Sequence, residues 1–241
     1  GGTIDRFFYG MAMVWSPAFI AGHAVALHSD YEADGFSKPY QWALILYGGL
    51  FAILGVIISR KILLHFFSDN VTAATLFLMF IGTNIFFFST IGNDVPHVYL
   101  FTLYTLIIWF TIKWYEKFKL IYAIGLGMAM GITMAVRQSE IIAAIIPVMW
   151  GVTSYKTLVE KFGTLWKYRW HVILAAIIAM LTILPQLFYW RTFAGEYLLN
   201  VYNDAGSTLN LRNPRFDYVL FSFRKGWFIY SPLSLLSFFG L

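Results

Sequence analysis

The sequence predicts an all-α fold, a polytopic transmembrane helical bundle with an interfacial juxtamembrane helix. Of the 241 residues, 59% are hydrophobic and 12% are charged, whereas a soluble domain carries about 25% charged residues. Mean hydropathy is +0.68, and the run 70–93 holds 24 residues without a formal charge. The net charge of +5 belongs to the loops between apolar runs, so we expect membrane lipids and no nucleic acid as partners.

The first apolar run, Phe7–Ser29, has 23 residues and no charge. Its polar residues Tyr9, Ser16 and His23 recur every seven positions, so they form one stripe if the run is helical. Pro17 should kink such a helix. The run either spans the membrane or lies at its surface, and the stripe and the kink favour the surface.

The following runs are predicted to cross the membrane. Two segments of membrane length joined by the short polar turn Ile91–Tyr99 form a transmembrane hairpin. The next pair has only 17 and 15 residues, about 25 and 23 Å of helix against a hydrocarbon core of about 30 Å. That pair either dips without crossing or holds its polar tip below the surface. The expected segments are Pro39–Ser59, Asn70–Ile91, Val95–Ile112, Leu120–Val136, Ile141–Tyr155, Trp170–Trp190 and the start of a last helix in Phe221–Leu241.

Loop charges predict the orientation. The loops 60–69, 113–119 and 156–169 hold nine Lys and Arg against three acids, and the opposite side holds eight against nine. Because cytoplasmic loops are enriched in Lys and Arg, the first set should be cytoplasmic. The turn 91–97 and the loops 30–38, 137–140 and 191–217 then share the outer face.

Costly polar residues gather on that outer face. Ionisable groups at or inside the membrane surface are functional candidates because their desolvation is expensive. Asp94 and His97 are the candidate catalytic residues, and the candidate substrate-binding residues are Arg137, Arg224, Lys225 and Asp5. Each of these groups also has a purely structural interpretation. His97 could cap a helix, and Asp94 could be a turn residue. Arg137 could pair with Glu140, and Arg224-Lys225 could bind lipid headgroups. Neither a metal nor a cofactor is expected.

Three stretches in this order resemble the GT-C superfamily of polytopic glycosyltransferases. They are the run from GGLFAILGVIISRK through IGNDVPHVYLFTLYTL, then GLGMAMGITMAVRQSEIIAAIIPVMWG, and finally LFSFRKGWFIYSPLSLLSFFGL. The order is similar to bacterial members related to protein mannosyltransferases, aminoarabinose transferases and RgtA/B/C/D-like proteins. The resemblance covers roughly Arg6 to Leu241.

The resemblance implies transfer of a sugar from a polyprenyl-phosphate donor to a lipid, glycan or protein acceptor. It implies a bacterial inner membrane protein whose active site faces outward. The family's catalytic Asp lies in a first outer loop, of which Asp5 would be the tail. Several members carry an Asp where this chain has Pro96-His97, a departure that Asp94 could offset.

The chemistry asks for residues of these types. A base must lie near the acceptor hydroxyl, and a cation must stabilise the departing phosphate, a task that suits Arg. The chain begins without Met and stops inside an apolar run, so we expect one transmembrane domain over 1–241 that is truncated at both ends. The alternatives are a transporter or flippase of lipid-linked sugars and a non-catalytic membrane scaffold.

Overall fold

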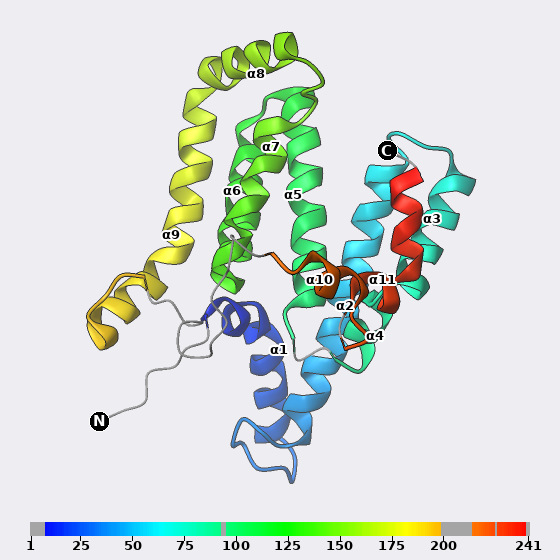
Figure 1. Cartoon of the computed structure of the whole chain (residues 1–241). Helices are drawn as coiled ribbons and strands as arrows, with labels where there is room; N and C mark the ends of the chain where they lie inside the picture. Colours follow the sequence, from blue (N-terminus) through cyan, green and yellow to red (C-terminus); the bar gives the residue numbers. More distant parts are fainter. Residues whose placement is uncertain (1–7, 93–94, 199–213, 225, 240–241) are drawn as a thin grey trace.

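The computed structural model describes residues 8–92, 95–198, 214–224 and 226–239, and within them every regular element is a helix (Figure 1). In chain order they are α1 (Gly10–Leu27), α2 (Lys38–Leu63), α3 (Asp69–Gly82), α4 (Ile85–Thr90), α5 (His97–Lys117), α6 (Leu120–Val136), η1 (Gln138–Ala144), α7 (Ile145–Met149), α8 (Tyr155–Lys167), α9 (Arg169–Ala194), α10 (Phe216–Phe221), α11 (Trp227–Tyr230) and η3 (Pro232–Phe239). The all-α prediction is confirmed for this part of the chain.

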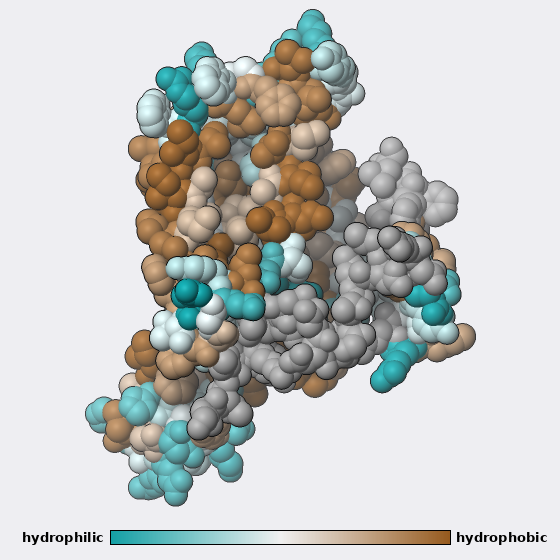
Figure 2. Space-filling model, turned by 60° about the vertical axis from the view of Figure 1, so that its left-hand side comes forward, coloured by the Kyte–Doolittle hydropathy of each residue, from teal (hydrophilic) through white to brown (hydrophobic). Residues whose placement is uncertain are grey.

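Four of these helices, α1, α2, α5 and α9, are long and apolar enough to cross a membrane. The face of the molecule on the α9 side is mostly brown with paler residues between, and hydrophilic residues gather at its top and bottom (Figure 2). Large apolar side chains on α9, among them Ile177 and Leu181, are about half exposed. A surface of this kind is suited to contact with lipid tails, as the composition predicts.

Small residues let α1 pack closely. Its buried positions are Gly10, Val14, Ala18, Gly22 and Ala26, one every four residues and therefore on one face. A Cβ on Gly22 would lie 2.9 Å from the Tyr40 Cα of α2, and one on Gly10 would meet the backbone of Ala135 at the end of α6. Helix α1 therefore packs through this face, and the predicted stripe of Tyr9, Ser16 and His23 is not the buried one. Pro17 lies inside an uninterrupted helix.

Glycine also brings α6 and α9 together. A Cβ on Gly127 would lie 2.5 Å from the Ala175 carbonyl oxygen, and one on Gly131 would lie 2.7 Å from the Thr182 hydroxyl. The GxxxG pair thus lets the two helix backbones approach closely, as such pairs do in membrane helices.

The three basic loops meet at one end of the bundle. His65, after α2, lies 3.6 Å from a Glu116 carboxylate oxygen near the end of α5. The Lys161 ammonium of α8 lies 3.5 Å from the centre of the Tyr115 ring, also on α5. Helix α8 lies across this end of α9, while the α1–α2 loop lies at the opposite end (Figure 1). The predicted grouping of the basic loops is confirmed.

Two predicted spans are wrong. The run Asn70–Ile91 is not one helix, because α3 ends at Gly82, the next residue has extended backbone (φ −126°, ψ 177°), and α4 begins only at Ile85. The Thr83 hydroxyl donates a 2.6 Å hydrogen bond to the Met79 carbonyl, which satisfies an acceptor at the broken helix end. The last apolar run is likewise divided into α11 and η3 by Ser231-Pro232, since Pro lacks the N–H that would continue a helix.

The second short apolar run is not a full span, in line with one of the two alternatives for it, and the basic loop after it differs from expectation. Residues 138–149 form a 3₁₀-helix followed by one short α-helical turn, η1 and α7, so this run is not a spanning α-helix. The predicted loop Lys156–Arg169 is mostly the amphipathic helix α8. Its start has a capping box in which Ser154 and Thr157 exchange hydrogen bonds.

Candidate functional site

The end of the bundle opposite α8 contains a pocket of about 860 Å³. Three segments far apart in the sequence line it: the α3–α4 break and α4, the start of α5, and the region from Arg224 to Ser231. Its polar lining residues are Thr83, Asn84, His97, Arg224, Tyr230 and Ser231, and the others include Phe87, Phe88 and Trp227. We call this cavity the rim pocket. Its size lies within the usual range for small-molecule sites.

His97 lies at the wall of the rim pocket because α5 begins there. Pro96 is the N-cap residue, with its φ already at −69°, and the helix then places His97 at its first position. The imidazole packs on the Phe88 ring with 4.4 Å between ring centres. Its side chain is exposed, so a substrate could reach it.

Arg224 reaches the same pocket from the other end of the chain. It follows α10 and lies within a tight turn that is closed by a 2.6 Å hydrogen bond from the Gly226 N–H to the Ser222 carbonyl. The Tyr230 hydroxyl donates a 2.8 Å hydrogen bond to the Phe223 carbonyl, which ties α11 to this turn. The Arg224 side chain is exposed and forms no ion pair with another described residue. Because Arg224 is exposed and lines the rim pocket, its guanidinium can contact an anionic ligand there.

Arg137 lies near the rim pocket but does not line it. It is the extended residue (φ −150°) between α6 and η1, and its guanidinium Nε lies 3.7 Å from a Glu140 carboxylate oxygen. The Tyr104 hydroxyl donates a 2.5 Å hydrogen bond to the other Glu140 oxygen. The charges of Arg137 and Glu140 both act on His97. Arg137 thus has the structural role of pairing with Glu140, and it can also bias the charge of the pocket wall.

Tyr104 is the member of this cluster that sequence reasoning missed. It lies seven residues after His97 on α5, two helical turns along the same face. That spacing was the available signal, because it brings the phenol back to the side on which His97 stands. Asn84 was missed because the α3–α4 break was not expected.

Three predicted site residues, Asp5, Asp94 and Lys225, lie outside the described residues. Of the predicted site residues that are described, His97 and Arg224 share the rim pocket and Arg137 is adjacent to it. No group of three or more His, Asp or Glu side chains that could hold a metal ion occurs in the described parts of the chain.

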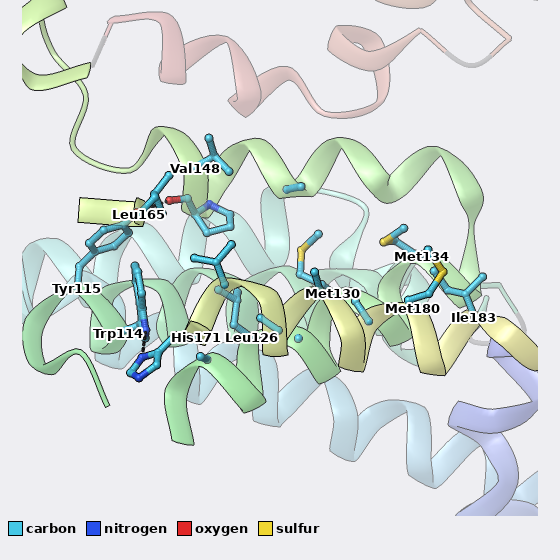
Figure 3. Close-up of a pocket in the computed structure, with 18 residues that line it drawn as sticks. Trp114, Tyr115, Leu126, Met130, Met134, Val148, Leu165, His171, Met180 and Ile183 are labelled. Atoms are coloured by element: carbon cyan, nitrogen blue, oxygen red, sulfur yellow. Dashed lines mark hydrogen bonds between the residues drawn. The ribbon is translucent and has the colours of Figure 1, made fainter. Parts of the chain in front are cut away.

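A second cavity of about 290 Å³ lies among α5, α6, α7, α8 and α9. Figure 3 shows it as a long groove with Tyr115, Trp114 and His171 at one end and Met134, Met180 and Ile183 at the other. The Trp114 indole N–H donates a 3.1 Å hydrogen bond to His171 Nδ1. We call this cavity the lateral groove.

Comparison with known proteins returned no match to any protein-family model, to any curated protein or to any solved structure. The functional argument for this chain is therefore built on its own residues.

Proposed function

We propose that the protein is a membrane glycosyltransferase that moves a sugar from a polyprenyl-phosphate donor to an acceptor hydroxyl at the membrane surface. The observation that carries the proposal is the convergence of His97 and Arg224, which are far apart in sequence, on one pocket of about 860 Å³. The four apolar helices of membrane-crossing length supply the setting that a lipid-linked donor requires. The ordered resemblance to GT-C enzymes points to the same chemistry.

In this proposal Arg224 binds the donor phosphate. A guanidinium presents donors in a planar fork that matches phosphate oxygens, and it stabilises the negative charge that grows as the glycosidic bond to phosphate breaks. Arg224 suits this role better than Arg137, because Arg137 is already paired with Glu140 at 3.7 Å and Arg224 has no acidic partner in the described structure.

His97 is then the general base. It accepts the proton of the acceptor hydroxyl as the oxygen attacks the anomeric carbon, and the polyprenyl phosphate leaves with the bonding electrons. An imidazole is suited to this task because its ordinary pKa lies near neutral pH. The Phe88 ring, 4.4 Å from the imidazole centre, fixes the orientation of the base. Asp94 is the alternative base, three residues earlier.

The test uses the full-length protein in lipid nanodiscs with a panel of polyprenyl-phosphate sugars and measures release of polyprenyl phosphate and transfer of the sugar. We expect His97→Ala to lower turnover by about 10²- to 10⁴-fold, the usual contribution of a general base. Arg224→Gln should lower turnover of the same donor.

The matched controls lie at the opposite end of the bundle. His65→Ala and Arg60→Gln remove the same side-chain types from exposed ion pairs with Glu116 and Asp69, and both variants should keep full turnover. Unchanged turnover in His97→Ala and Arg224→Gln, with normal elution in size-exclusion chromatography, would contradict the assigned roles. Movement of the donor between leaflets without sugar transfer would instead favour the flippase.

A further inference from the structure

The lateral groove has the shape of a site for one hydrocarbon chain. From Ala123 to Met134 along α6 it extends about 16 Å at 1.5 Å per residue. Its volume of about 290 Å³ is at the low end for ligand pockets. Apart from Trp114, His171 and the Tyr115 hydroxyl its side chains are apolar, and Met130, Met134 and Met180 supply flexible, polarisable walls.

The two ends of the groove differ in polarity (Figure 3). The Met134, Met180 and Ile183 end carries only apolar side chains, while the opposite end is formed by Trp114, Tyr115 and His171 with Leu165 of α8. An amphiphile in the groove would therefore place its tail toward Met134 and its headgroup toward α8.

The ammonium of Lys161 lies at that headgroup end. The Lys161 ammonium lies 3.5 Å from the centre of the Tyr115 ring, and Tyr115 lines the groove. Lys161 forms no ion pair with a described residue. Partial burial lowers the pKa of its ammonium below the ordinary value, which an anionic ligand beside it would reverse.

Helix α8 itself has the features of a helix that lies in the membrane surface. Tyr155, Val159, Phe162 and Trp166 recur at helical spacing and are all more than half exposed, while Lys161 and Leu165 are on the inward face. An exposed apolar stripe bordered by basic residues binds the headgroup region of a bilayer. Anionic lipids are attracted to such a basic surface, so they would surround the mouth of the groove.

We propose that the lateral groove binds one acyl chain of an anionic phospholipid from the leaflet at α8, with its phosphate held by Lys161. The headgroup end of this site lies at the α8 end of the bundle, away from the rim pocket, and the inference does not depend on the proposed transfer activity. The bound lipid would fill the gap among α6, α7 and α9 and would fix α8 against the bundle.

The experiment places the full-length protein in nanodiscs that contain a photoactivatable phosphatidylglycerol, with the diazirine either near the glycerol or at the chain end, and maps the labelled peptides. We expect the glycerol-proximal probe to label residues 114–115 and 161–165, and the chain-end probe to label 134 and 180–183. Phosphatidylcholine carrying the same diazirines should label these sites less.

Two variants and one control test the assignment. Lys161→Gln should lower phosphatidylglycerol labelling about fivefold, the effect of one cation at an anionic surface, and Lys156→Gln, an exposed lysine on the same helix, should leave it unchanged. Ala176→Leu adds bulk at an exposed groove position and should lower labelling by both phospholipids.

The inference is overturned by equal labelling with the two phospholipids, by the reverse order of the two diazirine positions, or by equal losses in Lys161→Gln and Lys156→Gln. Lys161 is partly buried and Lys156 is exposed, so normal elution of both variants in size-exclusion chromatography is needed to separate loss of binding from loss of fold.

Discussion

Adding one methyl group at Gly127 tests the contact that joins α9 to the bundle. A Cβ at this position would lie 2.5 Å from the Ala175 carbonyl oxygen and 2.8 Å from the Ala175 Cα. Both are backbone atoms, so no side-chain rotation relieves the clash. Reaching an ordinary contact of 3.4 Å requires α6 and α9 to separate by about 0.9 Å.

The expected cost follows from that separation. Overpacking by one carbon costs about 1–3 kcal/mol, and the better helix propensity of Ala returns up to about 1 kcal/mol. We therefore expect Gly127→Ala to lower the free energy of unfolding by about 1–2 kcal/mol. The control is Gly163→Ala on α8, where nothing lies within 4 Å of the added Cβ. Because no clash opposes the better helix propensity of Ala at this position, the free energy of unfolding should rise by up to about 1 kcal/mol.

Unfolding of the two variants in the same detergent, followed by circular dichroism during titration with sodium dodecyl sulfate, measures both changes. Opposite signs for Gly127→Ala and Gly163→Ala are the predicted result. A Gly127→Ala protein as stable as the parent would mean that α6 and α9 are not in backbone contact, and the lateral groove between them would lose its basis.

Three further predictions concern the rim end and its loops. The chain has no cysteine, so introduced cysteines can be cross-linked without background. A short bismaleimide should join the two cysteines of His97→Cys/Arg224→Cys but not those of His97→Cys/Arg60→Cys. Equal cross-linking of both pairs would contradict the shared pocket. Tyr104→Phe removes a hydrogen bond to the largely buried Glu140 carboxylate and should lower the free energy of unfolding by about 1.5–3 kcal/mol. The control Tyr122→Phe on α6 should change it little. Equal stability of the two variants during titration with sodium dodecyl sulfate would argue against the Tyr104–Glu140 hydrogen bond. The N–H groups of Phe36 and Ser37 donate to Asp34 and hold the pKa of its carboxyl below the ordinary value. The loop therefore gains stability at pH values above the ordinary Asp pKa and loses it as the pH falls through the lowered pKa. Amide chemical shifts of Phe36 and Ser37 should titrate with a midpoint below the ordinary Asp pKa, and a higher midpoint would refute these hydrogen bonds.

Composition and apolar periodicity predicted the part of the fold that depends on burial alone. The α6 segment was found to the residue, since it is one apolar run bounded by Lys and Arg. The α2 segment was found to within one residue at its start, but the helix continues past Arg60 and Lys61 and ends at Leu63, four residues after the predicted end at Ser59. Hydropathy does not reveal a break in the backbone, so the run Asn70–Ile91 was predicted as one helix, although the helix α3 ends at Gly82. The basic segment 156–169 was read by charge, and the apolar spacing of Val159, Phe162 and Trp166 that marks α8 was overlooked.

The site was predictable to the extent that topology sorts loops to one face. Reasoning from loop charges placed His97 and Arg224 on the same side, and the structure brings them to one pocket. The same reasoning could not predict the part of the pocket wall that Thr83 and Asn84 form, because these residues line the pocket only where the helix breaks after α3. The lateral groove was also out of reach, since it depends on how α6, α7 and α9 fit together in space.

The most direct measurement for the whole account is photolabelling with a polyprenyl-phosphate sugar that carries a diazirine on the sugar, bound to the full-length protein in nanodiscs. The account predicts that labelled peptides contain residues 83–88, 97–98 or 226–231, the segments that supply most of the rim pocket's lining. It also predicts that Arg224→Gln reduces the label while Arg60→Gln does not. Label confined to the α8 end of the bundle, or no saturable label with any such donor, would contradict it.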